Sequence, residues 1–411
     1  MFRAPIAGLV GVVFSLLVCS ASIANTQPAR DADTAAHSRL NAGAQMISGL
    51  SPASPALNAF MQSAAWEEHR AFMHAAWKRL NDRQAAPMAA WRDGALPKAC
   101  PAGKTLMYPF SGPDFFNAHW LFPGCETIVM FGLEHIGAVP DLESLSERDL
   151  VQLLAEVRVA MKSFLERNYF ITDNMARQMR SSQLRGVLPV FMLSMALMGM
   201  DIVSIAPYEL APLSRPDAPP DGRPMRNLRG VTIEYWATGS PATQRVHYFT
   251  VDATDKGLAH FPEFLAFVRT LGPATTFIKS ASYLLHGNEF RQIRAALLDI
   301  SAFIVQDDSG MPYAMLERRD WRVDLYGRYG RPIRPFGGAF QAGLDQAFKA
   351  QHPAPLPFTF GYQYRDFRDQ RSNLMVARRS STGEKATVRD EVRGTPFNSV
   401  ATSRTAISPG N

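Results

Sequence analysis

The order of elements around residues 105–131 most constrains the fold. Residues 105–110 form a buried apolar run typical of a strand, and a Ser-Gly-Pro-Asp turn follows at 111–114. A short helix is predicted over 115–122 and a second strand over 126–131. A strand, a turn, a helix and a strand in this order are what a parallel α/β sheet requires. We therefore expect an α/β protein.

The later chain continues this pattern. Ser146 with Asp149 resembles a capping box before a long helix. The other predicted elements are a buried helix over 187–198, a strand over 202–205, a hairpin from the runs 231–236 and 245–251, a strand over 275–280, a helix over 289–300 and a strand over 303–306. We expect one Rossmann-like domain over 99–365, with a mostly parallel sheet, an inserted β-hairpin and a helical segment at 46–98 packed on it.

The first 24 residues have the pattern of an export signal. Arg3 precedes an apolar run over 6–18, and Ser22 and Ala24 stand where signal peptidase requires small side chains. We expect cleavage after Ala24 and a mature protein in the periplasm or secreted. Lipidation at Cys19 is an open alternative. No later stretch reaches the roughly 20 apolar residues of a membrane span. Residues 25–45 are predicted to be a disordered leader.

The positive charge is concentrated near the C-terminus. The chain has a formal net charge of +6, but residues 365–411 hold nine Lys or Arg against five Asp or Glu. The body is therefore nearly neutral, which argues against a nucleic-acid surface. Residues 371–411 are polar and without period, so we predict a disordered basic tail.

Two cysteines, Cys100 and Cys125, remain after the signal. In an oxidising compartment they predict one disulfide; two buried free thiols are the alternative. No H-E-x-x-H or comparable spacing occurs, so we expect no dedicated metal site. Trp66 and Trp77, in the N-terminal helical region, are expected in the core. A groove that docks a protein partner is the alternative for them.

Polar side chains follow three of the predicted strands. Ser111 and Asp114 follow the first, Glu134 the second, and Asp307 with Asp308 a later one. The carboxyl ends of parallel strands share one edge, where α/β proteins bind ligands. Glu134 occupies the position of the acid that binds ribose hydroxyls in nucleotide-binding folds. We expect Glu134, Asp307 and Asp308 to bind a small polar ligand.

Catalysis is the second hypothesis for the same edge. Asp114 is either a helix N-cap or a general base, His119 is a second candidate base, and Ser111 is the candidate nucleophile. Ser111 lacks the G-x-S-x-G frame, and G-x-G-x-x-G is absent, so we predict no dinucleotide cofactor. Lys279, beside Ser280, is a weaker candidate because the S-x-x-K order is missing.

Two resemblances extend this interpretation. The strand at 275–280, the helix at 289–300 and the strand ending in Asp307-Asp308 resemble the second half of a Rossmann-like methyltransferase. Export argues against S-adenosylmethionine as a cofactor, and we expect none. The chain is also similar to exported bacterial proteins of unassigned activity. That similarity lies in Tyr108-Pro-Phe-Ser-Gly-Pro-Asp114, Phe131-Gly-Leu-Glu134 and Gln306-Asp-Asp-Ser-Gly-Met-Pro-Tyr313, and it implies one integral domain.

The sequence thus predicts an exported protein that binds a small polar ligand at the carboxyl edge of an α/β sheet. A hydrolase or transferase at that edge and an envelope protein-interaction module are the alternatives.

Overall fold

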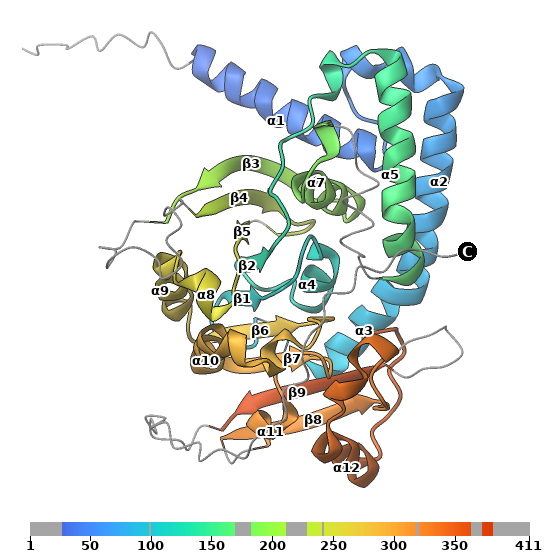
Figure 1. Ribbon diagram of the computed structural model, residues 1–411. Helices are drawn as coiled ribbons and strands as arrows, with labels where there is room; N and C mark the ends of the chain where they lie inside the picture. The colour runs from blue at the N-terminus through green and yellow to red at the C-terminus, as the bar shows by residue number, and fades with distance from the viewer. Residues whose placement is uncertain are drawn as a thin grey trace, which may run out of the picture.

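A nine-stranded mixed sheet organises the molecule (Figure 1). The computed structural model describes residues 27–97, 100–168, 182–210, 228–240, 242–317, 320–362 and 372–380. The strand order is β3-β4-β5-β2-β1-β6-β7-β9-β8. The strands are β1 (Thr105–Tyr108), β2 (Thr127–Gly132), β3 (Asp201–Tyr208), β4 (Arg229–Trp236), β5 (Thr243–Thr250), β6 (Ala274–Ile278), β7 (Ser301–Gln306), β8 (Trp321–Gly327) and β9 (Asn373–Arg379).

The five central strands are parallel, which confirms the Rossmann-like prediction. β1 pairs in parallel with β2 and β6, β2 with β5, and β6 with β7. The chain therefore builds outward from β1 through β2 to β5, and then returns to the other side of β1 for β6 and β7. This reversal between β1 and β6 is a topological switch point, where open α/β sheets bind their ligands.

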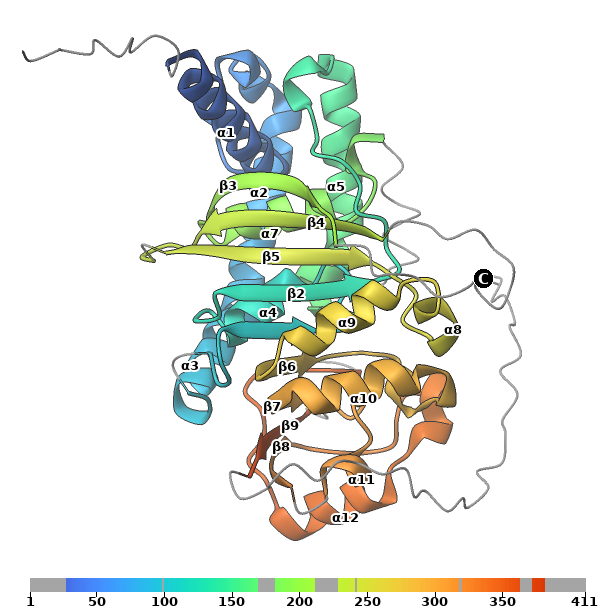
Figure 2. The ribbon, with the colours of Figure 1, turned by 90° about the vertical axis from the view of Figure 1, so that its left-hand side faces the viewer.

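Alternating side chains of the central strands enter two cores on opposite faces of the sheet. Leu106 and Met130 belong to one core, whereas Met107 and Val129 belong to the other. The helices α8 (Asp255–Leu258), α9 (Pro262–Thr270) and α10 (Arg291–Ile300) cover the second core (Figure 2). Since both faces are covered, β2 and β7 are mostly apolar, as buried parallel strands usually are, whereas β5 retains several polar side chains.

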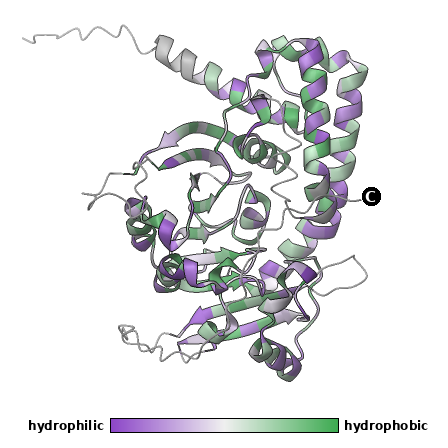
Figure 3. Cartoon of the chain, viewed as in Figure 1, coloured by the Kyte–Doolittle hydropathy of each residue, from purple (hydrophilic) through white to green (hydrophobic). Residues whose placement is uncertain are grey.

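The first core is covered by the N-terminal helices and the helices between β1 and β3. These are α1 (Gln27–Ile47), α2 (Ala64–Leu80), α3 (Ala86–Ala95), α4 (Phe115–Leu121), α5 (Glu147–Arg167) and α7 (Leu188–Leu197). Every residue from Leu188 to Leu197 is buried, and Figure 3 colours α7 as hydrophobic. Trp66 is 3% exposed, and Trp77 packs against Phe116 and Trp120. The tryptophans are thus packing residues of the helical layer.

The predicted hairpin forms, but it is not a separate insertion. β4 and β5 pair antiparallel over their full length, and β5 also pairs in parallel with β2. Its second strand is therefore one of the five central strands. The antiparallel extension of the sheet at this edge consists of β4 and β3.

The structure corrects parts of two predictions about the ends of the chain. The leader at 25–45 is helical from Gln27, and Ala44, Met46 and Ile47 are buried in the first core. Its alanines favour a helix, and the contact with α7 stabilises it. Within the predicted tail, residues 373–379 form β9, which lies between β7 and β8, and residues 381–411 lie outside the described residues. Asn373–Ala377 is buried in this strand, but the basic residues on both sides of it favoured the prediction of a polar tail.

Cys100 and Cys125 form the predicted disulfide. They precede β1 and β2, and therefore join the two strands at the edge opposite their carboxyl ends. None of the described helices is long and apolar enough to cross a membrane. The predicted signal, residues 1–24, lies outside the described residues.

Candidate functional site

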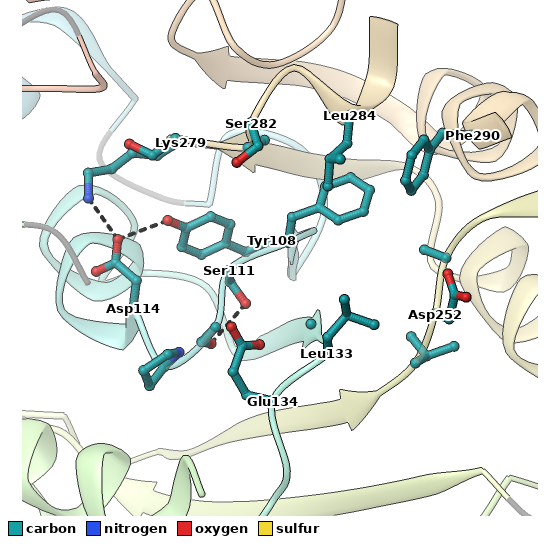
Figure 4. Close-up of a pocket in the computed structure, with 18 of the residues that line it drawn as sticks. Tyr108, Ser111, Asp114, Leu133, Glu134, Asp252, Lys279, Ser282, Leu284 and Phe290 are labelled. Carbon is teal, nitrogen blue, oxygen red and sulfur yellow. Dashed lines mark hydrogen bonds and ion pairs between the residues drawn. The ribbon is translucent and has the colours of Figure 1, made fainter. Parts of the chain in front are cut away.

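A cavity of about 440 Å³ lies at the switch point, where β1, β2, β5 and β6 end (Figure 4). Its lining comes from the four segments that follow these strands. These are residues 110–114, 132–134, 251–254 and 279–282, joined by Tyr108, Leu284, Phe290 and Tyr362. The cavity has the size of a small-molecule site.

A buried ion pair connects β1 and β6 across the switch point. The Lys279 ammonium lies 2.9 Å from Asp114 Oδ2, with only 2% and 6% of their side chains exposed. Tyr108 donates its hydroxyl to the same oxygen at 2.9 Å, and Asn117 Nδ2 donates to Oδ1 at 2.8 Å. Lys279 also donates to the carbonyl of Asn168. The two charges thus compensate each other inside the protein.

Asp114 therefore has a structural role. Its Oδ1 accepts the backbone N–H of Asn117 and caps α4. Burial, and then the negative charge of Asp114, raises the pKa of Tyr108 well above its ordinary value. The phenol consequently remains a donor to the carboxylate. A carboxylate that already accepts from Lys279, Tyr108 and Asn117 is poorly placed to remove a proton from a substrate.

Glu134 presents its carboxylate to the cavity, directly after β2. Tyr248 donates its hydroxyl to Oε2 at 3.1 Å, and Thr250 donates to the Glu134 carbonyl at 2.7 Å. Oε1 receives no hydrogen bond from the residues that the structure describes. Figure 4 shows the carboxylate directed into the cavity beside Ser111. Glu134 is thus a fixed acceptor with one oxygen available to a ligand.

Two glycines make room for this carboxylate. A Cβ at Gly132 would lie 2.2 Å from Glu134 Oε2, and a Cβ at Gly112 would lie 3.2 Å from Oε1. Gly112 also has a φ of +51°, which few other residues adopt. The missing side chains at Gly112 and Gly132 therefore leave the space that the Glu134 carboxylate occupies.

The candidate nucleophile and its base lie apart. Ser111 lines the cavity, but its hydroxyl donates to the backbone carbonyls of Gly112 and Phe131. His119 does not line the cavity; its ring packs against Phe115 and Tyr235. Burial lowers the pKa of His119 to about 4, so the ring is neutral at pH 7. The structure thus shows no serine–histidine pair at these positions.

Asp307 and Asp308 do not line the cavity either. Both are fully buried after β7. Asp307 accepts the backbone N–H of Ser280, and Asp308 accepts the hydroxyl of Tyr283. Because β6 lies between β1 and β7, the turn after β6 separates these acids from the cavity. Of the residues expected at the site, the structure brings Ser111, Asp114 and Glu134 to the cavity and leaves His119, Asp307 and Asp308 behind it.

The cavity has a polar and an apolar half. Figure 4 shows Lys279 and Asp114 on one side, and Leu133, Leu284 and Phe290 on the other, with Asp252 at the rim of this apolar half. Leu133 is 72% exposed, although it lies between two cavity-lining residues. An exposed apolar side chain at a cavity wall is surface that a ligand can cover.

Acidic groups dominate the charge of the lining. Within the described lining, Lys279 is neutralised by Asp114, whereas Glu134 and the exposed Asp252 have no cationic partner. The lining is therefore net negative. The sequence indicated Lys279 only weakly and missed Asp252, although Asp252 follows the predicted strand 245–251 at the same edge.

No family model, curated protein or solved structure matches this chain. Among the described residues, no group of three or more His, Cys, Asp or Glu side chains is arranged to hold a metal ion. The function is therefore inferred from the cavity.

Proposed function

We propose that this protein binds a nucleoside, a ligand with adjacent hydroxyl groups and a flat ring, in the cavity at the switch point. The observation that carries the proposal is the Glu134 carboxylate, which is held at the end of β2 with one oxygen available beside an apolar half-cavity. This specifies the small polar ligand that the sequence predicts.

The position of Glu134 favours ribose hydroxyls. It follows the Ser111-Gly112 turn by roughly 20 residues, the spacing at which dinucleotide-binding folds place their ribose-binding acid. A carboxylate accepts hydrogen bonds and donates none when ionised, so it selects donors such as hydroxyls. The hydrogen bond from Tyr248 fixes the other oxygen and so orients the group.

The apolar half suits the base. Phe110 and Phe290 meet edge to face at 5.7 Å between ring centroids, and Leu133 and Leu284 complete this half. An aromatic ring of the ligand would cover Leu133 and contact the phenylalanines, and such aromatic contacts contribute about 0.5–1.5 kcal/mol beyond the buried area.

The charges disfavour a phosphorylated ligand. The first turn of α4, where dinucleotide-binding folds hold pyrophosphate, is capped by the Asp114 carboxylate. Lys279 is engaged by the same carboxylate, and Glu134 and Asp252 would repel a phosphate. These contacts support a neutral or cationic nucleoside over a nucleotide.

We further propose that binding occurs outside the cytoplasm. The disulfide between Cys100 and Cys125 supports an oxidising compartment, and the residues 1–24 have the pattern of an export signal. Binding is favoured over a hydrolase or transferase because Asp114 is engaged and Ser111 has no base among its hydrogen-bond partners.

Calorimetric titration with adenosine tests the proposal. Glu134→Gln should weaken adenosine binding about 10- to 100-fold, since a hydrogen bond to a charged group contributes roughly 1.5–3 kcal/mol. Glu126→Gln is the matched control, because Glu126 lies at the other end of the same strand, paired with Lys104. AMP should bind at least about tenfold more weakly than adenosine. Equal affinity of Glu134→Gln and wild type, or tighter binding of AMP, would refute the nucleoside assignment.

A further inference from the structure

The turn after β6 is a strained wall of the cavity. Ser280, Ser282 and Tyr283 have φ values of 53°, 53° and 56°, in the left-handed region. Ser280, Ala281 and Ser282 line the cavity. Left-handed conformations cost residues other than glycine about 1–2 kcal/mol each and persist only where the surroundings hold them. Three such residues within four positions therefore require an external support.

Asp307 and Ser309 provide that support from behind. Asp307 Oδ2 accepts the Ser280 N–H at 3.1 Å, and Ser309 Oγ accepts the Ala281 N–H at 2.8 Å. Ser309 in turn donates its hydroxyl and its backbone N–H to Asp307 Oδ1. Both oxygens of the Asp307 carboxylate therefore accept hydrogen bonds that lead to the wall.

Tyr362 holds the turn from the cavity side. Its hydroxyl donates to the carbonyl of Ser280 and lies 3.1 Å from Ser282 Oγ. The preceding residue, Gly361, packs on Asp307: a Cβ there would lie 2.3 Å from Asp307 Oδ2. The turn and the carboxylate are thus enclosed together, and the state of one affects the other.

We propose that Asp307 is a positioning residue of this cavity, and that the ionised Asp307 carboxylate holds residues 280–283 in the shape that receives the ligand. Protonation replaces one acceptor oxygen by a hydroxyl donor. The proton then faces either the N–H of Ser280 or the donors of Ser309, so one of the two connections between Asp307 and the turn is weakened and the wall loosens. The part concerning ligand affinity rests on the proposed nucleoside function; the part concerning the turn does not.

The electrostatic surroundings place this change near neutral pH. Burial, and then the neighbouring Asp308, raises the pKa of Asp307 from 3.8 to about 7, while the hydrogen bonds from Ser309 and Ser280 lower it. The phenols of Tyr108 and Tyr283 also face Asp307, and their own pKa values are raised, so they stay neutral. Burial opposes the ionised form in the fold as a whole, whereas the hydrogen bonds of Ser280 and Ser309 favour it. A local opening that breaks these hydrogen bonds while Asp307 stays buried is therefore disfavoured by ionisation, so protection of the turn rises with pH although the free energy of unfolding falls.

Hydrogen exchange of the full mature chain tests the turn without any ligand. We measure the protection factor of a peptide covering residues 279–284. A protection factor is corrected for the intrinsic pH dependence of exchange. In wild type, protection should fall at least about tenfold between pH 8 and pH 6, the size expected for a lost hydrogen bond to a charged group. Asp307→Asn should show the low value at both pH values.

Two variants separate positioning from general destabilisation. Asp299→Asn, an exposed charge on α10, should keep the wild-type pH response. Ser309→Ala removes the acceptor of the Ala281 N–H but leaves the titrating group, so protection should be lower at both pH values while the response to pH persists. Equal protection of wild type at pH 6 and pH 8, or an unchanged pH response in Asp307→Asn with protection of β7 intact, would overturn the proposal.

Adenosine titration at pH 8 and pH 6 then links the turn to binding. Affinity should fall at pH 6 in parallel with protection, and Asp307→Asn should bind equally weakly at both pH values. A wild type whose affinity does not change while its protection does would overturn the claim about affinity. Failure to bind adenosine at either pH would count against the nucleoside function, whereas the exchange result would still decide the role of Asp307.

Discussion

Replacing Lys279 by methionine leaves the Asp114 carboxylate buried without its cation. The carboxylate keeps the donors Tyr108 and Asn117, but its negative charge is no longer compensated. Breaking a buried pair typically costs about 3–5 kcal/mol. We expect a cost near the lower limit for Lys279→Met, because the remaining donors solvate the carboxylate. Asp114→Ala should cost more, because it leaves the ammonium with only the Asn168 carbonyl among its described partners.

The double variant distinguishes the ion pair from simple packing. With Lys279→Met and Asp114→Asn combined, no buried charge remains, and neutral replacement of buried pairs is often nearly neutral in stability. The double variant should therefore be at least about 2 kcal/mol more stable than the sum of its single changes predicts. Urea unfolding at pH 7 measures this coupling.

Lys104→Met is the matched control, since the pair of Lys104 with Glu126 is exposed. It should cost at most about 1 kcal/mol. If Lys279→Met were as mild as Lys104→Met, or if the single changes were additive, the pair would not stabilise the switch point as we infer.

Three further predictions concern other parts of the structure. Gly132→Ala should weaken adenosine binding at least about tenfold in calorimetry, because its Cβ would displace the Glu134 carboxylate; wild-type affinity would contradict the described fit. Because burial, and then Asp308, raise the pKa of Asp307 above its ordinary value, the free energy of unfolding should fall as pH rises from the ordinary carboxyl pKa towards neutral pH. Asp307→Asn should remove that part of the slope in denaturant titrations at pH 5 and pH 8, and identical slopes would argue against a raised pKa. Reduction of the Cys100–Cys125 bridge, which closes a separation of 25 residues, should lower stability by about 3 kcal/mol; a thermal unfolding midpoint that dithiothreitol leaves unchanged would show that the bridge does not stabilise the fold.

The sequence predicted the elements of the sheet better than their arrangement. The runs at β1, β2, β6 and β7 could be found because buried strands are short and apolar. Their order could not, since pairing between segments far apart in the chain leaves no local signal. For this reason the sequence places Asp307 and Asp308 at the correct edge of the sheet but in the cavity. In the structure they lie behind the cavity wall.

Long-range pairing explains the other misjudged residues. The role of Lys279 depends on its ion pair with Asp114, which is 165 residues away in the chain. The position of Glu134 at the cavity could be predicted because it depends on local order alone, a strand followed by an acid. β9 was missed because its buried run lies within a basic segment.

A crystal structure of the protein with adenosine would show where the nucleoside binds. We predict that the ribose hydroxyls lie within hydrogen-bond distance of Glu134 Oε1, and that the base contacts Leu133 and Phe290. Adenosine bound outside this cavity, or with its ribose directed away from Glu134, would contradict the account.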